Sequence, residues 1–256
     1  MGFSPEWLSL REPVDRQARD DALLQRAVQA AGPQPVIMDL GCGTGSTLRA
    51  MAEHLPSGTR WHLVDNDPTL LQIASDQVHE AQTHVLDLGD LPALPLDGVT
   101  LVTASALLDL MPAGWVQELA ALLARRGIGF YAALSYDGIM HWDPALPDDA
   151  GIRDAFNKHQ RGDKGLGPAL GPEAAAAARQ AFDHAGFHTA IADSPWRIDA
   201  DHAEMHAMLV EGIATAAAET GVAQADAWAR ARIATGGLCT TGHQDLLALP
   251  QTDLGG

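Results

Sequence analysis

The segment 36–56, VIMDLGCGTGSTLRAMAEHLP, places a carboxylate next to a glycine-rich turn. Its glycines occupy alternate positions, at Gly41, Gly43 and Gly45. Because a glycine carries no Cβ, the backbone of such a turn can approach a ligand closely. Asp39 lies two positions before the first glycine, where its charge would oppose a pyrophosphate. The segment therefore favours a ligand that presents an ammonium group.

The glycine spacing separates this turn from two common nucleotide-binding turns. A P-loop ends in Gly-Lys-Ser/Thr, and the segment contains no lysine. A dinucleotide-binding turn has the spacing G-x-G-x-x-G, and Ser46 stands where its third glycine would lie. The spacing argues against both kinds of turn.

The rest of the chain predicts strands that alternate with helices. Apolar runs predict strands at Val36–Leu40, Trp61–Val64, His84–Leu86, Val99–Ala104, Ile128–Leu134, Thr189–Ala192 and Thr240–Leu249. Helices are expected at Asp15–Ala31, Ser46–Leu55, Pro112–Ala124, Gly171–Gly186, Ala203–Ala218 and Ala223–Ala234, with one more after Asp67. This alternation predicts an α/β fold: a Rossmann-like, doubly wound, seven-stranded and mostly parallel sheet.

Polar residues follow the ends of the first four expected strands. Asp65 ends the second strand, 65 − 45 = 20 positions after Gly45, and Asp87 and Ser105 follow the third and fourth. Ligands of open α/β sheets bind at the carboxyl ends of the strands. We therefore expect these side chains to surround one ligand together with the turn.

These residues resemble a known family. DLGCGTG, residues 39–45, looks like motif I of the class I S-adenosylmethionine-dependent methyltransferases, and the resemblance extends over residues 34–135. It implies S-adenosyl-L-methionine as cofactor and S-adenosyl-L-homocysteine as its product. It also implies that Asp65 accepts the ribose hydroxyls, that Asp87 binds the adenine amine, and that Ser105 lies beside the methionine part. The expected cofactor site comprises Arg11, Asp39, Gly41, Cys42, Gly43, Asp65, Asn66, Asp87, Leu88 and Ser105.

The N-terminal segment 1–33 is expected to form a helical cap over the cofactor. In methyltransferases of this shape, such a segment often folds over the ligand, and Arg11 or Arg19 could then pair with the cofactor carboxylate. The alternative is that both arginines belong to a solvated helix face. We expect the cofactor-binding core to span residues 34–135.

Two insertions, 136–171 and 199–236, are expected to form a lid on the single domain 1–256. The first is rich in Gly, Pro, His and charged residues, so we expect a long irregular loop that carries binding residues, with one short helix near Asp149–His159. A loose insertion without a function is the alternative. Candidate substrate-binding residues are Asp109, Trp142, Arg161, Lys164 and Arg197. Asp109 could equally be a helix cap.

A histidine is a suitable proton acceptor for an oxygen nucleophile, because its pKa lies near neutral pH. The candidate catalytic bases are His141, His159 and His243. His202 and His206 have a spacing that could present two imidazoles to a metal, but no third ligand is evident, so we expect no metal site.

Composition narrows the class of partner. The chain of 256 residues has 33 acidic and 16 basic side chains, a net charge of −17, and no cluster of cations for phosphate neutralisation. Nucleic acid and anionic membranes are therefore disfavoured, and the Asp/Asn-Pro-Pro-aromatic signature of nucleic-acid methyltransferases is absent. The two cysteines have no metal-binding spacing, and no signal segment is recognisable, so a cytoplasmic protein is expected. The sequence leaves the oligomeric state open.

The sequence thus predicts an enzyme that transfers a methyl group from S-adenosylmethionine to oxygen or nitrogen of a small molecule, for which an anionic group is one option. HQRGDKGLGPALGP and GHQDLLALP resemble an uncharacterised bacterial small-molecule subgroup of the family. One alternative is a regulatory or partner subunit that binds the cofactor without transferring its methyl group. A nicotinamide-dependent oxidoreductase is a further alternative, disfavoured by the glycine spacing.

Overall fold

A computed structural model describes residues 4–76 and 81–251 of the chain. It contains one sheet whose strands follow the order β3-β2-β1-β4-β5-β8-β6, with a short β7 that also pairs with β8. The strands are β1 (Val36–Leu40), β2 (Arg60–Asp65), β3 (Ala81–Val85), β4 (Leu101–Ser105), β5 (Gly129–Asp143), β6 (Phe187–Asp193), β7 (Trp196–Ile198) and β8 (Leu238–Pro250). Strands β1 to β5 are parallel, and β8 is antiparallel to β5, β6 and β7. The α/β, mostly parallel sheet predicted from the sequence is confirmed, with β7 as an additional eighth strand.

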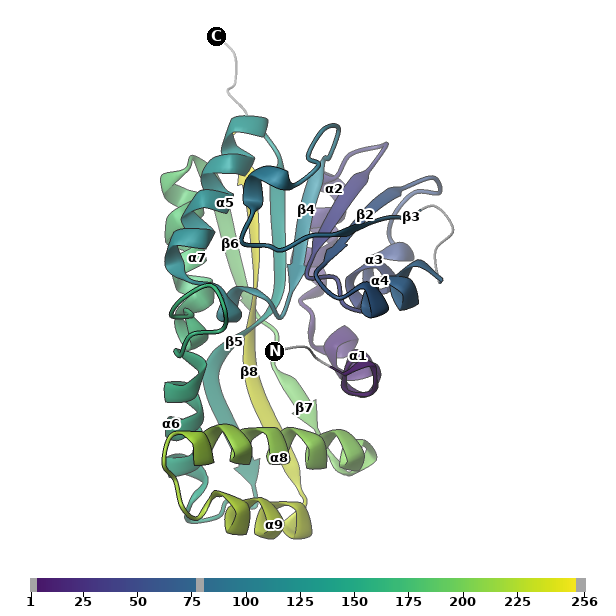
Figure 1. The fold of residues 1–256 in the computed structure, drawn as a ribbon. Coiled ribbons are helices and arrows are strands. Elements are labelled where there is room, and N and C mark those ends of the chain that lie inside the picture. The colour runs from purple at the N-terminus through teal and green to yellow at the C-terminus, as the bar shows by residue number, and fades with distance from the viewer. Residues whose placement is uncertain (1–3, 77–80, 252–256) are drawn as a thin grey trace.

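Helices cover both faces of the sheet (Figure 1). They are α1 (Pro5–Ala18), α2 (Asp21–Ala30), α3 (Ser46–Ala52), α4 (Pro68–Ser75), α5 (Ala113–Arg126), α6 (Asp149–Gln160), α7 (Ala174–His184), α8 (Ala203–Glu219) and α9 (Ala225–Thr235). Short 3₁₀ segments lie at η1 (Leu91–Ala93), η2 (Leu108–Leu110), η3 (Gly171–Glu173) and η4 (Ala200–His202). None of the helices within the described ranges is long and apolar enough to cross a membrane.

Adjacent residues of the central strands contribute to two separate cores. Ile37 of β1 belongs to the core that includes α2, whereas its neighbour Met38 belongs to the core that includes α5 and α7. Every residue of β1 is buried, as expected for a strand covered on both faces. The strands that position the glycine turn are therefore held from both sides.

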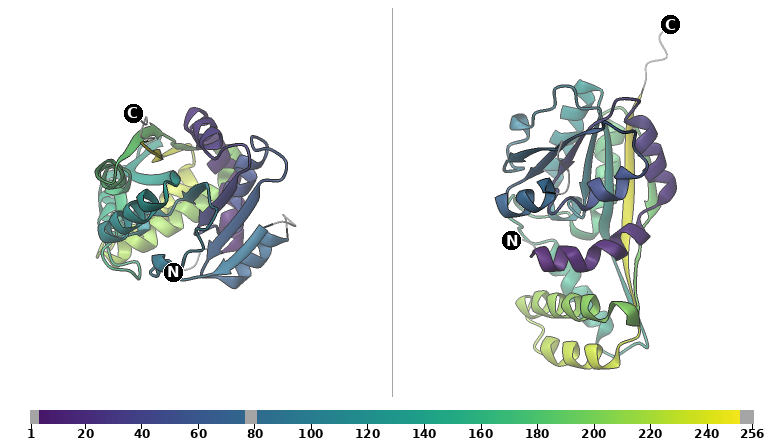
Figure 2. Two further views of the ribbon diagram at one scale, coloured as in Figure 1. Left: turned by 90° about the horizontal axis from the view of Figure 1, so that it is seen from above. Right: turned by 90° about the vertical axis from the view of Figure 1, so that its right-hand side faces the viewer.

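The N-terminal segment before β1 forms two helices, α1 and α2, whereas the sequence predicts one helix over Asp15–Ala31. The chain is extended at Arg19, which ends α1. The side chain of Asp20 then accepts a hydrogen bond from the N–H of Leu23 (2.7 Å) and caps α2. The break gives α1 a direction of its own, and α1 lies between the core and the helices α8 and α9 (Figures 1 and 2).

Strands β5 and β8 continue well beyond the core and carry α6, α8 and α9 (Figure 1). We call this part, residues 136–160 and 199–241, the cap. The predicted end of the fifth strand at Leu134 is wrong, because pairing with β8 resumes after irregularities at Ala132–Ser135 and Tyr136–Met140. The expectation of a long irregular loop over 136–171 is wrong for residues 136–143, which continue β5 to Asp143. The short helix expected near Asp149–His159 is confirmed as α6. Whether this segment closes over a ligand stays a prediction.

Candidate cofactor and substrate site

The glycine turn joins β1 to α3 with three left-handed residues. The φ angles of Gly41, Gly43 and Gly45 are 62°, 54° and 86°. A Cβ at Gly41 would lie 3.2 Å from Leu107, and one at Gly43 would lie 3.2 Å from Leu8 of α1. Only glycine fits this backbone without strain, and the turn lies between α1 and the segment after β4.

Asp65 fixes the turn from the end of β2. Its Oδ2 accepts a hydrogen bond from the N–H of Gly43 (2.8 Å), and its Oδ1 accepts one from the N–H of Asp67 (3.0 Å). The residue is only 9% exposed. The carboxylate is therefore already oriented next to the turn, where the sequence places a ribose-binding residue.

Asp39 is a fully buried carboxylate at the end of β1. Its Oδ1 accepts a hydrogen bond from Thr103 Oγ1 (2.8 Å), while its Oδ2 is buried without a hydrogen-bond partner among the described residues. Burial raises the pKa of Asp39 to about 7, although the Thr103 hydroxyl, the positive charge of Arg19 and the nearby Thr47 hydroxyl lower it. An unpaired buried carboxylate of this kind is costly unless a ligand completes it.

Arg19 is the buried cation next to this carboxylate. Its Nη2 donates a hydrogen bond to Ser105 Oγ (3.0 Å) at the end of β4, and the residue is 5% exposed. Its Nε and Nη1 are buried without partners among the residues that the structure describes. Arg19 and Asp39 thus leave polar atoms of opposite charge unsatisfied beside the glycine turn, which suits a ligand with both an ammonium and a carboxylate.

Arg11, the stronger sequence candidate for the cofactor carboxylate, is engaged elsewhere. It forms an ion pair with Asp15 (2.8 Å) and lies over the ring of Trp196, 5.1 Å from the ring centre. Asp15 also accepts a hydrogen bond from Trp196 Nε1 (2.9 Å). These contacts attach α1 to β7, so Arg19 fits the carboxylate role better than Arg11.

The end of β3 holds the expected adenine residues near the surface. Asp87 Oδ1 accepts a hydrogen bond from the N–H of Gly89 (2.8 Å), and the carbonyl of Leu88 accepts one from Trp115 Nε1 (2.6 Å). Leu88 is buried, whereas Asp87 and Asn66 are exposed. Cys42 is buried in the turn, and burial raises the pKa of its thiol, so it is an inert thiol and not a nucleophile.

Asp109 lies on η2, just after β4, where the core and the cap join. It is 9% exposed, and its Oδ1 is buried without a partner in the described part of the chain. Burial raises its pKa to about 6, while backbone N–H groups and the charges of Arg11 and Lys164 lower it. Two residues of this region have a strained backbone: Ala106, directly after β4, and Leu134, within the neighbouring strand β5, have φ angles of 48° and 58°.

The three candidate bases differ in their surroundings. Burial, followed by the charge of Arg11, lowers the pKa of His243 to about 3, so this residue is a poor base near neutral pH. Its Nδ1–H donates a hydrogen bond to the Thr241 carbonyl (3.1 Å). His159 on α6 bonds to Glu219 of α8 (2.8 Å). His141 is exposed on the outer part of β5.

The structure separates the other expected substrate residues. Lys164 lies near Asp109, donates to His159 Nδ1 (3.3 Å), and has a pKa lowered by burial. Arg161 is paired with Glu173 (3.0 Å), and Arg197 is exposed on β7. Trp142 is buried inside the cap, with its ring 5.4 Å from that of Trp228. The structure thus brings Asp109 and Lys164 together but not the other three.

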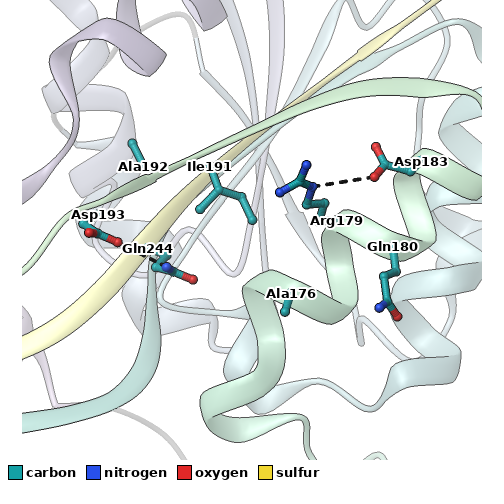
Figure 3. Close-up of a pocket in the computed structure, with 8 residues that line it drawn as sticks. All are labelled: Ala176, Arg179, Gln180, Asp183, Ile191, Ala192, Asp193 and Gln244. Atoms are coloured by element: carbon teal, nitrogen blue, oxygen red, sulfur yellow. Dashed lines mark hydrogen bonds and ion pairs between the residues drawn. The ribbon is translucent and has the colours of Figure 1, made fainter.

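The surface has one groove away from this site and one cavity at its rim. A groove of about 740 Å³ runs along α7 and β6. Figure 3 shows the residues that line it: Ala176, Arg179, Gln180, Asp183, Ile191, Ala192, Asp193 and Gln244. None of the candidate site residues lines it. A smaller cavity of about 320 Å³ lies between α1 and the glycine turn, lined by Pro5, Ser9, Glu12, Thr44, Arg49 and Ile73. No group of three or more His, Cys, Asp or Glu residues within 4–76 and 81–251 could hold a metal ion.

Comparisons with known proteins bear on the fold and on the kind of domain. Residues 37–127 match the model of a family described as methyltransferase domain, whereas no curated protein sequence matches the chain. A candidate type II methyltransferase of Anaeromyxobacter dehalogenans is 17% identical, with 91% of this chain and 98% of that chain covered and a TM-score of 0.55. Geranyl diphosphate C-methyltransferase of Streptomyces coelicolor, solved with Mg²⁺, geranyl diphosphate and S-adenosyl-L-homocysteine, is 16% identical, with 90% and 79% covered and a TM-score of 0.51.

At such identities the two solved structures establish the fold, and the family match establishes the kind of domain. The match favours methyl transfer over the nicotinamide-dependent alternative. Residues 37–127 of the chain are thus similar to a methyltransferase domain.

Proposed function

We propose that the protein transfers the methyl group of S-adenosylmethionine to an oxygen or nitrogen atom of a small molecule bound between the core and the cap. The observation that carries the proposal is the pair Asp39 and Arg19. Both side chains are buried beside the glycine turn, and each keeps unpartnered polar atoms, Oδ2 on one and Nε and Nη1 on the other. A zwitterionic amino-acid group would complete both.

Different residues would bind different parts of the cofactor. Arg19 would bind the carboxylate and Asp39 the ammonium, while Asp65 would accept the ribose hydroxyls in charge-assisted hydrogen bonds. When bound, the cofactor supplies an activated methyl group on a sulfonium. The protein's main contribution is then to align the nucleophile with that methyl.

Asp109 is the residue that we propose for proton transfer. As the methyl group bonds to the nucleophile, the proton on that oxygen or nitrogen would pass to Asp109 Oδ1, which has no partner among the described residues. With a pKa of about 6, Asp109 is ionised at neutral pH and can accept a proton. Asp109 is therefore a better candidate base than His243.

The proposal of an anionic substrate rests on Lys164 alone. Lys164 lies near Asp109, whereas Arg161 is paired with Glu173 on the surface. A substrate that carries a negative group next to its nucleophile would place that group at Lys164.

The cofactor part of the proposal is tested with two ligands that share a nucleoside. S-Adenosylhomocysteine has the amino-acid group, and 5′-methylthioadenosine lacks it. Calorimetry should show that Asp65→Asn weakens both ligands by about 1.5–3 kcal/mol, the contribution of hydrogen bonds to a charged group. Arg19→Met should weaken only S-adenosylhomocysteine, by a similar amount.

Two results would contradict this assignment. Equal loss of both ligands in Arg19→Met would remove Arg19 from the amino-acid end. Unchanged affinity in Asp65→Asn, with the fold intact by circular dichroism, would remove Asp65 from the ribose. Binding without methyl transfer to any member of a panel of hydroxyl and amine compounds would favour the partner-subunit alternative.

A further inference from the structure

A leucine on a loop of the insertion lies over the expected adenine end of the site. Leu166 is 38% exposed, which is unusual for a large apolar side chain in the described residues. A Cβ built on Gly89 would lie 3.0 Å from Leu166 Cδ2 and 3.2 Å from Asp87 Oδ1. Leu166 therefore lies against the turn that follows β3, although the two are far apart in sequence.

At Gly89, glycine matters because of the space that a side chain would take up, and not because of the backbone conformation. It is not among the glycines with a positive φ angle. Its backbone would accept another residue, but a Cβ there would lie 3.0 Å from Leu166 Cδ2, so the leucine side chain would have to shift by a few tenths of an ångström. The absent Cβ makes room for Leu166 at this place.

The loop that presents Leu166, residues 162–169, has a defined shape. Asp163 Oδ1 accepts hydrogen bonds from the N–H groups of Gly165 (2.7 Å) and Gly167 (3.0 Å), and these bonds lower the pKa of Asp163. The N–H of Ala169 donates to the carbonyl of Gly162 (3.1 Å) and closes the base of the loop. The tip is thus held although it is exposed.

Both ends of the loop are attached to elements of the site. The N–H of Leu170 donates to the carbonyl of Met111 (2.9 Å), directly after η2 and Asp109. Lys164 donates to His159 Nδ1 (3.3 Å) on α6. These bonds fix the loop to the core on one side and to the cap on the other.

We propose that the loop 162–169 forms the outer wall of the adenine site, with Leu166 packed on the purine. The proposal rests on the proposed cofactor site and on the expectation from the sequence that the adenine lies at Asp87 and Leu88. An adenine ring between Leu88 and Leu166 would cover apolar surface that is now exposed to water, and its polar edge would remain free for Asp87.

The test is the affinity of Leu166→Ala for S-adenosylhomocysteine and for 5′-methylthioadenosine, measured by calorimetry. Since both ligands carry the adenine, we expect both to bind about five- to twentyfold more weakly, in line with partial loss of one leucine contact. Leu166→Met should bind nearly as well as the natural protein, because methionine can fill similar space. The exposed position predicts an unchanged melting temperature.

The matched control is Ile139→Ala. Ile139 is 48% exposed on β5, is also a large apolar residue, and should not alter either affinity. Natural affinity in Leu166→Ala, while Asp65→Asn weakens both ligands, would overturn the loop proposal and keep the cofactor site. A natural protein that binds neither ligand would overturn both. Loss for S-adenosylhomocysteine alone would place Leu166 at the amino-acid end and would also overturn the proposal.

Discussion

At the scale of single residues, Asp39 has the property with the clearest consequence for pH. Burial raises its pKa to about 7, and its ionised form is the one that binds an ammonium. The ionised fraction rises from about one tenth at pH 6 to about nine tenths at pH 8 for a pKa of 7. We therefore expect the affinity for S-adenosylhomocysteine to increase by about tenfold between these pH values.

The sign of this effect can be checked directly. Binding would shift Asp39 from its protonated to its ionised form, so calorimetry at pH 6.5 in buffers of different ionisation enthalpy should report proton release. Asp39→Asn, which keeps the acceptor for Thr103, should bind more weakly and lose most of the pH dependence. A flat profile in the natural protein would separate Asp39 from the ammonium.

The sequence predicts some of these residues better than others. Asp39 and Gly43 could be located because they lie in one short motif. Asp65 could be located because it ends the next strand, in an order that is typical of the fold. The role of Arg19 could not be separated from that of Arg11, because the choice depends on the direction of α1 and on a contact with Trp196. The raised pKa of Asp109 depends on its burial in the folded chain, where Arg11, Tyr136 and Lys164 also act on it, and no local sequence pattern shows this.

At the scale of elements, the glycine turn is the part whose shape is most closely tied to binding. Gly43→Val would place a branched side chain at a φ of 54°, with its Cβ 3.2 Å from Leu8. We expect S-adenosylhomocysteine binding to fall by at least a hundredfold, and the fold to be destabilised by about 1–3 kcal/mol, typical of a residue held in a strained conformation. Calorimetry and urea unfolding measure the two effects.

Gly58→Ala separates the strain from the binding effect. Gly58 also has a positive φ angle, 88°, and an added Cβ would have nothing within 4 Å. This variant should lose stability without losing affinity. If Gly43→Val still binds like the natural protein, the turn does not contact the ligand.

The elements themselves show where sequence patterns fail. The strands β1 and β4 are short and mostly apolar, so their positions are close to those expected. The outer half of β5 is hidden because irregular pairing at Leu134 and Gly138, both with positive φ, breaks the alternation that marks a strand. Polar residues such as Asp137 and His141 in that half then imitate a loop.

At the scale of the whole molecule, the core and the cap are joined by shared strands. β5 runs from Gly129 in the core to Asp143 in the cap, and β8 runs back from Leu238 to Pro250. Because the same two strands belong to both parts, we expect the cap to be a rigid extension of the sheet rather than a separate unit. A substrate bound between them would then be held by one continuous framework, with α1 and the loop 162–169 completing its walls.

Arg232 offers a test of this unity. It is fully buried in the cap, where it pairs with Asp149 (3.3 Å), donates to the Pro144 carbonyl (2.8 Å) and lies 5.8 Å from the ring of Trp142. Arg232→Ala would leave Asp149 without its cation and open a cavity, so we expect a loss of about 3–5 kcal/mol in the free energy of unfolding, as when one partner of a buried pair is removed.

If the shared strands couple the core to the cap, the stability lost in Arg232→Ala should move the unfolding of the whole protein, in a single transition, to lower urea concentration. Urea unfolding followed by tryptophan fluorescence and by far-ultraviolet circular dichroism should give coincident curves, both moved to lower urea. Arg179→Ala is the control, since Arg179 is exposed and its pair with Asp183 is long (3.7 Å); it should change stability by less than about 0.5 kcal/mol. Two separate transitions, with only the first one moved, would show that the cap unfolds independently of the core and that β5 and β8 do not transmit stability between them.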